Sequence, residues 1–144
     1  MKALLAVPIF EKGPLKGDLK MARKVMIFSS VHRYDDSRIF HKQAVSLARA
    51  GYQVELHAVA DFDERMDQGI RIVGLPSHRN RLRRLLAGWL LFRRALRAKA
   101  DVYHFHDPEL LPWGLLLKWA TRRPVVYDAH EDLPKQIYTK PWIP

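Results

Sequence analysis

The chain has 144 residues, and its 48% hydrophobic and 28% charged content is ordinary for one globular domain with a buried core. The absence of cysteine excludes a disulfide framework and a thiolate metal site, and no run approaches the roughly 18 apolar residues that a membrane span needs. The formal net charge of +10 favours an anionic partner, and we expect a cytoplasmic location.

The first residues differ in composition from the rest of the chain. Residues 11–18 hold two glycines and a proline among scattered charges, and a second methionine precedes the first strand. Such a segment has too little apolar surface to offset the entropy that ordering costs. We therefore predict that residues 1–22 are a flexible extension and that residues 23–144 form one domain.

The remaining pattern alternates strands and helices. A first strand leads into a polar loop, where Asp36 or Ser37 can cap the next helix, and Gly51 suits the left-handed residue that ends it. Asp107 is the predicted cap of the last helix, with Pro108 in its first turn. Strands are predicted at 24–28, 54–59, 70–75, 102–105 and 125–127, a polar turn at 61–69, and helices at 79–100 and 108–120.

This order predicts an α/β fold, a Rossmann-like open parallel sheet with helices on both faces. Right-handed crossovers place strands 54–59 and 70–75 on one side of the first strand, and strands 102–105 and 125–127 on the other. The topological switch point then lies between the first strand and strand 102–105. Ligands of such sheets bind outside the carboxyl ends of the strands at that point.

Three polar loops are expected at that edge of the sheet. The first loop has no glycine, which argues against a dinucleotide-binding G-x-G-x-x-G turn. Its Arg33, Asp36 and Arg38 suit hydrogen bonds to a polyhydroxylated ligand; the alternative is that Asp36 and Arg38 only cap a helix and pair. His130 lies just beyond a strand end and is the best single candidate for a functional side chain. The other candidates at this edge are His106, Asp107, Glu109, Asp128 and Glu131.

A metal site is the alternative interpretation of the histidines and carboxylates at these strand ends. His104 and His106 share one face of a strand, because alternate side chains face opposite layers. A histidine in a buried strand is more often a packed core residue than a ligand. We predict no metal and no cofactor.

The helix predicted at 79–100 carries +8 of the formal +10 and has no acidic residue. A solvated charged face is the ordinary interpretation, but uncompensated positive charge repels itself and favours an anionic partner. Apolar residues among the arginines favour a membrane surface, with nucleic acid as the alternative. The predicted core face comprises Leu82, Leu85, Leu86, Trp89, Phe92 and Leu96, and the predicted membrane-facing residues are Arg83, Arg84, Leu90, Leu91 and Arg94.

Three segments carry a resemblance to a known family. The segment KVMIFSSVHRYDDSRIFHKQAVSLARAGYQVELHA contains Asp36-Ser37-Arg38 and the helix end Ala50-Gly51-Tyr52-Gln53-Val54. It is followed by VYHFHDPELL and by VVYDAHE. In order and spacing they resemble the opening half of glycosyltransferase family 4, with its D-x-R loop and its H-x-H-D/E-P strand end. The resemblance covers about residues 24–135 and matches His130 to the family's active-centre histidine.

The resemblance implies a GT-B enzyme, in which two Rossmann-like domains face each other across a cleft. The N-terminal domain mainly holds the acceptor, and the C-terminal domain binds a nucleotide-sugar. It also implies a retaining, metal-independent transferase, in which His130 helps to orient the transferred sugar and the loops at 33–38 and 106–109 shape the acceptor pocket. The acceptor would be a polysaccharide or a lipid-linked glycan precursor.

This sequence departs from the family pattern in two ways. It lacks the glycine pair that many members carry in the first loop, and it stops before the donor-binding domain. We therefore expect half an enzyme that is inactive alone. The alternatives are a basic module that binds membrane or nucleic acid without catalysis, and a stand-alone interaction domain.

Overall fold

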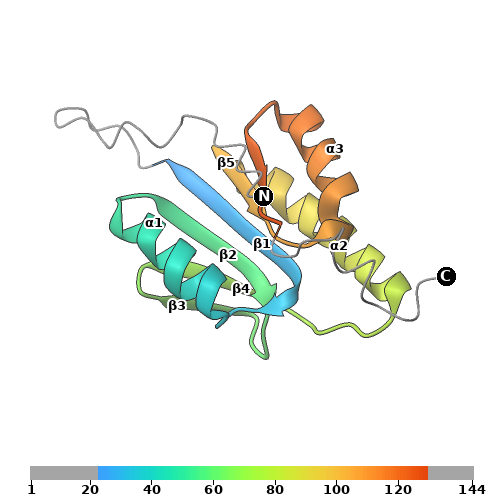
Figure 1. The fold of residues 1–144 in the computed structure, drawn as a ribbon, viewed down its shortest axis with the longest axis horizontal. Coiled ribbons are helices and arrows are strands. Elements are labelled where there is room, and N and C mark those ends of the chain that lie inside the picture. Colours follow the sequence, from blue (N-terminus) through green and yellow to red (C-terminus); the bar gives the residue numbers. More distant parts are fainter. Residues whose placement is uncertain (1–22, 130–144) are drawn as a thin grey trace.

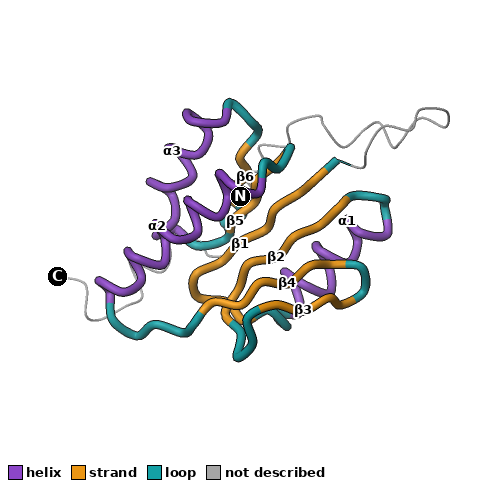
Figure 2. The backbone as a smooth tube through the Cα atoms, turned by 180° about the vertical axis from the view of Figure 1, so that it is seen from behind, coloured by secondary structure: helices purple, strands orange, loops and turns teal. Residues whose placement is uncertain are grey.

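The computed structural model describes residues 23–129 as one sheet with helices on both faces (Figures 1 and 2). The predicted extension at 1–22, together with His130 and Glu131, lies outside the described residues. The strands are β1 (Lys24–Arg33), β2 (Gln53–Val59), β3 (Glu64–Asp67), β4 (Ile70–Leu75), β5 (Val102–Phe105) and β6 (Val125–Tyr127). The helical segments are the π-helix η1 (Ser37–Ala44), α1 (Val45–Arg49), α2 (Arg81–Ala98), the 3₁₀ turn η2 (Pro108–Leu110) and α3 (Leu111–Thr121).

The sheet confirms the predicted fold class and strand placement. Its strand order is β3-β4-β2-β1-β5-β6, and every pairing is parallel except that of β3 with β4. After β4 the chain passes through α2 and enters β5 on the other side of β1. The switch point therefore lies between β1 and β5, as the sequence predicts.

The central strand β1 supplies both cores of the domain. Val25 and Ile27 pack in the layer with η1 and α1, whereas Met26 and Phe28 pack in the layer with α2 and α3. Successive side chains of a strand point to opposite faces, so a strand that is covered on both sides must be apolar throughout. This requirement explains the unbroken apolar run at the start of β1.

β1 is longer than the predicted strand at 24–28. It continues to Arg33, and its register against β2 shifts between Phe28 and Arg33. Beyond Phe28 its residues are mainly polar, and the sequence therefore resembles a loop. Their extended conformation depends on hydrogen bonds to a distant carboxylate, which are described with the site below.

The predicted polar turn at 61–69 contains a strand, β3, that the sequence analysis missed. β3 and β4 form an antiparallel hairpin, and its turn residues Gln68 and Gly69 have φ values of 48° and 77°. Positive φ at both turn residues suits the right-handed twist of a two-stranded hairpin. β3 is an exposed, mostly charged edge strand, so it shows no apolar alternation.

The predicted core face of α2 is wrong. Five of its six residues, Leu82, Leu85, Leu86, Trp89 and Leu96, are exposed, and only Phe92 packs partly against the core. The helix instead buries Ala87, Gly88, Leu91 and Ala95. Small side chains let the helix backbone come close to its neighbours, so three of the four buried positions are small and most of the bulky residues face outward.

The prediction of a membrane-facing position is therefore wrong for two residues, Leu91 and Arg94. Leu91 is 0% exposed and belongs to the core beneath α2. Arg94 is partly buried and donates to the carbonyl oxygen of Gly74 at 3.3 Å, and this burial lowers the pKa of its guanidinium. Arg83 and Leu90 are exposed, as the assignment requires.

A buried acidic group on β2 lies at the centre of a cluster of basic side chains. The Glu55 carboxylate accepts from His57 Nε2 at 2.6 Å, and it lies 2.7 Å from Lys24 Nζ and 3.3 Å from Arg71 Nη1. Burial raises the pKa of Glu55, but hydrogen bonds from His57 and Lys24 outweigh it and lower that pKa to about 2. Burial also lowers the pKa of His57, against the opposing effect of Glu55.

This cluster predicts how stability depends on pH. Below about pH 6.5 the free energy of unfolding should fall, because unfolded His57 takes up a proton that the folded protein excludes. A further loss should follow between pH 4.5 and about 2, where the Glu55 carboxyl is protonated in the unfolded chain but not in the folded one. Denaturant unfolding at a series of pH values measures both losses.

Glu55→Gln tests the second loss directly. The variant should be less stable by about 1.5–3 kcal/mol at neutral pH, because it loses charge-assisted hydrogen bonds. The difference from wild type should shrink as the pH falls toward about 2. Asp63→Asn is the control, because Asp63 is an exposed carboxylate directly before β3. A difference that stays constant across this pH range contradicts the assignment.

Candidate functional site

The carboxyl ends of β1, β5 and β6 bring three polar segments to one edge of the sheet. β5 pairs in parallel with β1 on one side and with β6 on the other. Ser29 and Ser30 lie in the later part of β1, His106 and Asp107 follow β5, and Asp128 follows β6. Residues more than 70 positions apart in sequence thus meet at the switch point.

The buried Asp107 carboxylate ties the end of β1 to the end of β5. Its Oδ2 atom accepts hydrogen bonds from Ser29 Oγ at 2.9 Å, from the Ser30 backbone nitrogen at 2.7 Å and from Ser30 Oγ at 3.2 Å. Asp107 is at the N-cap position of the following helix, but its side chain makes no capping bond. The predicted capping role is therefore wrong, because its oxygens bind the β1 segment instead.

Four further contacts extend this connection. Ser30 Oγ lies 2.6 Å from Glu109 Oε1, and Glu109 Oε2 lies 3.8 Å from Arg84 Nη1 at the start of α2. His32 lies between two carboxylates, with Nε2 3.5 Å from Asp107 Oδ1 and Nδ1 3.8 Å from Asp36 Oδ2. The ends of β1 and β5 and the start of α2 are thereby connected through polar side chains.

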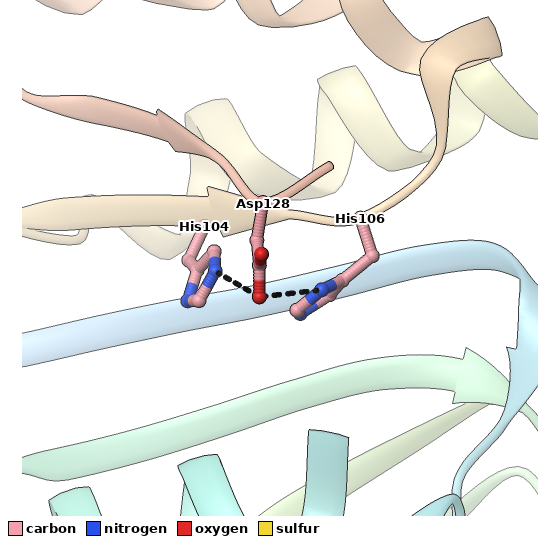
Figure 3. Close-up of side chains that lie close together, drawn as sticks. All are labelled: His104, His106 and Asp128. Atoms are coloured by element: carbon pink, nitrogen blue, oxygen red, sulfur yellow. Dashed lines mark ion pairs between the residues drawn. The ribbon is translucent and has the colours of Figure 1, made fainter. Parts of the chain in front are cut away.

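A second network centres on Asp128 (Figure 3). Arg38 Nη2 donates to both of its carboxylate oxygens, at 3.0 and 3.2 Å, and Gln43 Nε2 donates to Oδ2 at 2.7 Å. His106 Nδ1 and His104 Nε2 lie 3.7 and 4.0 Å from the same oxygen. Asp128 therefore joins side chains from η1, β5 and the end of β6.

The π-helix η1 explains why Arg38 and Gln43 reach the same carboxylate. A π-helix closes its hydrogen bonds between residues five apart, so residues five apart lie on the same side of the helix. Asp36 starts this helix, and its Oδ1 accepts from the backbone nitrogens of Arg38 at 2.9 Å and Ile39 at 3.0 Å. The alternative interpretation of Asp36 and Arg38 is thus correct in one part: Asp36 caps the helix. Arg38, however, pairs with Asp128 and not with Asp36.

His104, His106 and Asp128 are the group of potential metal ligands found among residues 23–129, with ligand atoms within 4.8 Å of one another. The Asp128 carboxylate already accepts from the Arg38 guanidinium and the Gln43 amide. A cation bound to Asp128 would lie beside that guanidinium charge, which disfavours metal binding. Asp128 is better described as the acceptor of the Arg38 and Gln43 hydrogen bonds, with the two histidine rings within 4.0 Å of it.

Comparison with protein families identifies the chain. The family described as "Glycosyl transferase 4-like domain" matches residues 37–143, which is well over half of the sequence. The chain belongs to this family. A search of curated proteins found no match.

The glycosyl transferase 4-like domain also resembles a solved GT-B structure. It aligns with sucrose-phosphate synthase from Thermosynechococcus elongatus with a TM-score of 0.65 and 15% sequence identity. The alignment covers 83% of this chain and 36% of the synthase, so the chain spans about a third of the length of that protein. At this identity the likeness shows the fold, and it confirms the predicted Rossmann-like GT-B class.

The glycosyl transferase 4-like domain brings together only some of the predicted site residues. Arg38, His106 and Asp128 meet in one network, and Asp107 and Glu109 bind the serines of β1. Arg33 instead forms an exposed pair with Asp35 at 3.1 Å, which raises the pKa of Arg33 and lowers that of Asp35. The sequence analysis missed the contributions of Ser29, Ser30 and Gln43. None of the helices described between residues 23 and 129 is both long and apolar enough to cross a bilayer.

The role of Asp107 gives a testable prediction. Asp107→Ala should lower the free energy of unfolding by at least about 1–3 kcal/mol, because it leaves the Ser29 hydroxyl and the Ser30 backbone N–H without their acceptor. Denaturant unfolding measures the change. Asp35→Ala, which removes an exposed carboxylate from the loop between β1 and η1, should leave the midpoint nearly unchanged. Equal stability of Asp107→Ala and wild type would show that these donors find other partners.

Proposed function

We propose that the chain is the acceptor-binding half of a retaining glycosyltransferase. Such an enzyme moves a sugar from a nucleotide-sugar to a polysaccharide or a lipid-linked glycan precursor, in the synthesis of cell-envelope polysaccharide. Family membership supports the transferase class. The observation that carries the acceptor role is the network of Arg38, Asp128 and His106 at the switch point of the sheet.

The side chains around this network suit a polyhydroxylated ligand. Arg33, Asp35 and Arg38 are exposed and present charged donors and acceptors between the end of β1 and the start of η1. Hydrogen bonds between ionised groups and hydroxyls are stronger than those between neutral groups. Asp128 holds Arg38 in place before a ligand arrives, which reduces the entropy that binding costs.

The proposed reaction needs a second domain for the donor. The acceptor hydroxyl oxygen bonds to the anomeric carbon, the bond from that carbon to the nucleotide's phosphate breaks, and the hydroxyl proton leaves with the departing phosphate. We assign to His130 the orientation of the transferred sugar, because it matches the family's active-centre histidine. The division into an extension at 1–22 and a domain at 23–144 remains a prediction.

We place this activity in the cytoplasm, with the protein peripheral on the inner face of the plasma membrane. The motive is the charge of α2, whose Arg81–Ala98 segment contains no acidic residue. A basic module that binds nucleic acid without catalysis is the second candidate, and the same observation favours it. The two candidates differ in whether Arg38 matters, since a nucleic-acid module would bind through α2.

Ligand binding by the chain separates these functions. On a glycan array, the chain should bind one or more glycans, and Arg38→Ala should weaken that binding about tenfold or more, because it removes a charged hydrogen-bond donor. Arg49→Ala, at an exposed position at the end of α1, is the matched control and should bind like wild type. Calorimetric titration with common nucleotide-sugars should show no micromolar binding.

Two results would contradict the acceptor assignment. Micromolar affinity of the chain for a nucleotide-sugar would place the donor site here instead. Tight binding of duplex DNA, with glycan binding absent or insensitive to Arg38→Ala, would favour the nucleic-acid module.

His130 is tested in a protein that also carries the donor-binding domain. His130→Ala should lower kcat far more than it lowers thermal stability, because the residue acts on the transferred sugar. His41→Ala, at an exposed position on η1, should retain activity. A variant that fails to fold would show that His130 is structural.

A further inference from the structure

We infer that the outer sides of α2 and α3 together form a docking face for an anionic lipid bilayer. This inference rests on the proposed function only for its biological role, because docking on a bilayer would bring the acceptor site to a lipid-linked substrate. It replaces the membrane face predicted from the sequence, which relied on the buried Leu91. The face is defined by Leu82, Leu85, Leu86 and Trp89 of α2 with Leu115 and Trp119 of α3.

These apolar side chains are unusually exposed. Trp119 is 82% exposed and Leu115 is 68% exposed on α3, while Leu82 and Leu86 are 64% and 60% exposed on α2. Soluble proteins rarely expose a contiguous apolar surface of this kind, and such a surface marks an interaction site. The burial of these residues by a partner is therefore expected.

The packing of α2 and α3 explains why both stripes point the same way. Both helices cover the same side of the sheet, with Leu91 of α2 and Leu117 of α3 in one core (Figures 1 and 2). Side chains on the opposite side of each helix must then face away from the sheet. The two exposed stripes thus belong to one side of the domain.

Close contact between the helices joins the two stripes. The Trp113 ring lies 5.7 Å from the Trp89 ring and 6.0 Å from the Phe92 ring. Gly88 allows this approach, because a Cβ atom there would lie only 2.2 Å from Trp113 Nε1. The close approach at Gly88 leaves no room for a larger side chain there, and the neighbouring Leu86 and Trp89 lie exposed on the outer side of α2.

Positive charge surrounds the apolar face. Neither α2 nor α3 contains an acidic residue, whereas Arg81, Arg83, Arg93 and Arg97 are exposed on α2. At the end of α3, a hollow of about 750 Å³ is lined by Leu115, Lys118, Trp119, Ala120 and Arg122. Cations beside an exposed tryptophan match the interface of an anionic bilayer, where headgroup phosphates meet acyl chains.

The charge pattern favours a bilayer over a second copy of the chain and over a nucleic acid. Two copies of the chain that paired through this face would bring their arginines together without acidic partners, which disfavours association. A nucleic acid would satisfy the arginines, but its phosphate backbone offers little to the leucines of both helices. An anionic bilayer interacts favourably with both groups.

Vesicle binding by the full chain tests this inference. Sedimentation with phosphatidylglycerol-containing vesicles should show binding that pure phosphatidylcholine vesicles do not support. Binding should weaken with salt, because the Debye length falls from about 10 Å at 0.1 M to about 3 Å at 1 M. Brominated lipids should quench the tryptophan fluorescence of the bound chain, and Trp119→Phe should remove much of that quenching.

Paired variants separate the apolar and the charged contributions. Trp119→Ser should weaken vesicle binding about tenfold, whereas Met66→Ser, at a position 64% exposed on β3, should have no effect. Arg81→Gln or Arg83→Gln should each weaken it about fivefold, whereas Arg49→Gln on α1 should have no effect. Thermal melts confirm that each variant folds, since all of these positions are exposed.

Three outcomes would overturn the inference. Equal binding to neutral and anionic vesicles would exclude the role of the arginines. Dimerisation without lipid that Trp119→Ser abolishes would assign the face to a second copy. Release of the chain from vesicles by equimolar duplex DNA would assign it to nucleic acid. None of these measurements uses a glycan or a donor, so their failure leaves the Arg38-dependent glycan test unaffected.

Discussion

The arrangement of the switch point depends on one buried carboxylate. Asp107 accepts three hydrogen bonds from Ser29 and Ser30, and both serines are themselves buried. A buried carboxylate is stable only where donors replace its lost hydration, so these bonds must form for the two strand ends to pack. They fix the later part of β1 in an extended path, which positions the loop that leads to Asp36. The position of the π-helix η1 follows from that loop.

The π-helix then connects the scaffold to the proposed acceptor site. Its five-residue hydrogen-bond repeat sets Arg38 and Gln43 on one side, and both donate to Asp128 at the end of β6. His104 and His106 approach the same carboxylate from β5. A structural carboxylate, Asp107, and a carboxylate near the surface, Asp128, thus have separate tasks. The first holds the strand ends together, and the second orients charged groups at the edge of the sheet.

The outer surface of the domain follows from how tightly α2 packs. Ala87, Gly88 and Ala95 let this helix approach the sheet and Trp113 closely, and the helix gains its stability from that contact. The leucines of α2 therefore remain outside, among arginines that have no acidic neighbours on the helix. The small residues on the inner side of α2 thus account both for its close contact with the core and for the leucines that remain among arginines on its outer side. The inferred membrane face is in this sense a consequence of core packing.

The sequence by itself determined the strands with strong apolar runs, the order of the sheet and the three polar segments at its carboxyl edge. These features depend on local periodicity and on the handedness of crossovers, which a single sequence records. Only the tertiary structure decided that Asp107 binds the serines of β1 and that Arg38 pairs with Asp128. It also decided that α2 turns Leu91 toward the core and leaves Leu82, Leu85 and Leu86 exposed. It also decided that the charged segment Glu64–Asp67 forms an edge strand. Each of these outcomes arises from partners distant in sequence or from close packing against small residues, and neither leaves a periodic pattern along the chain.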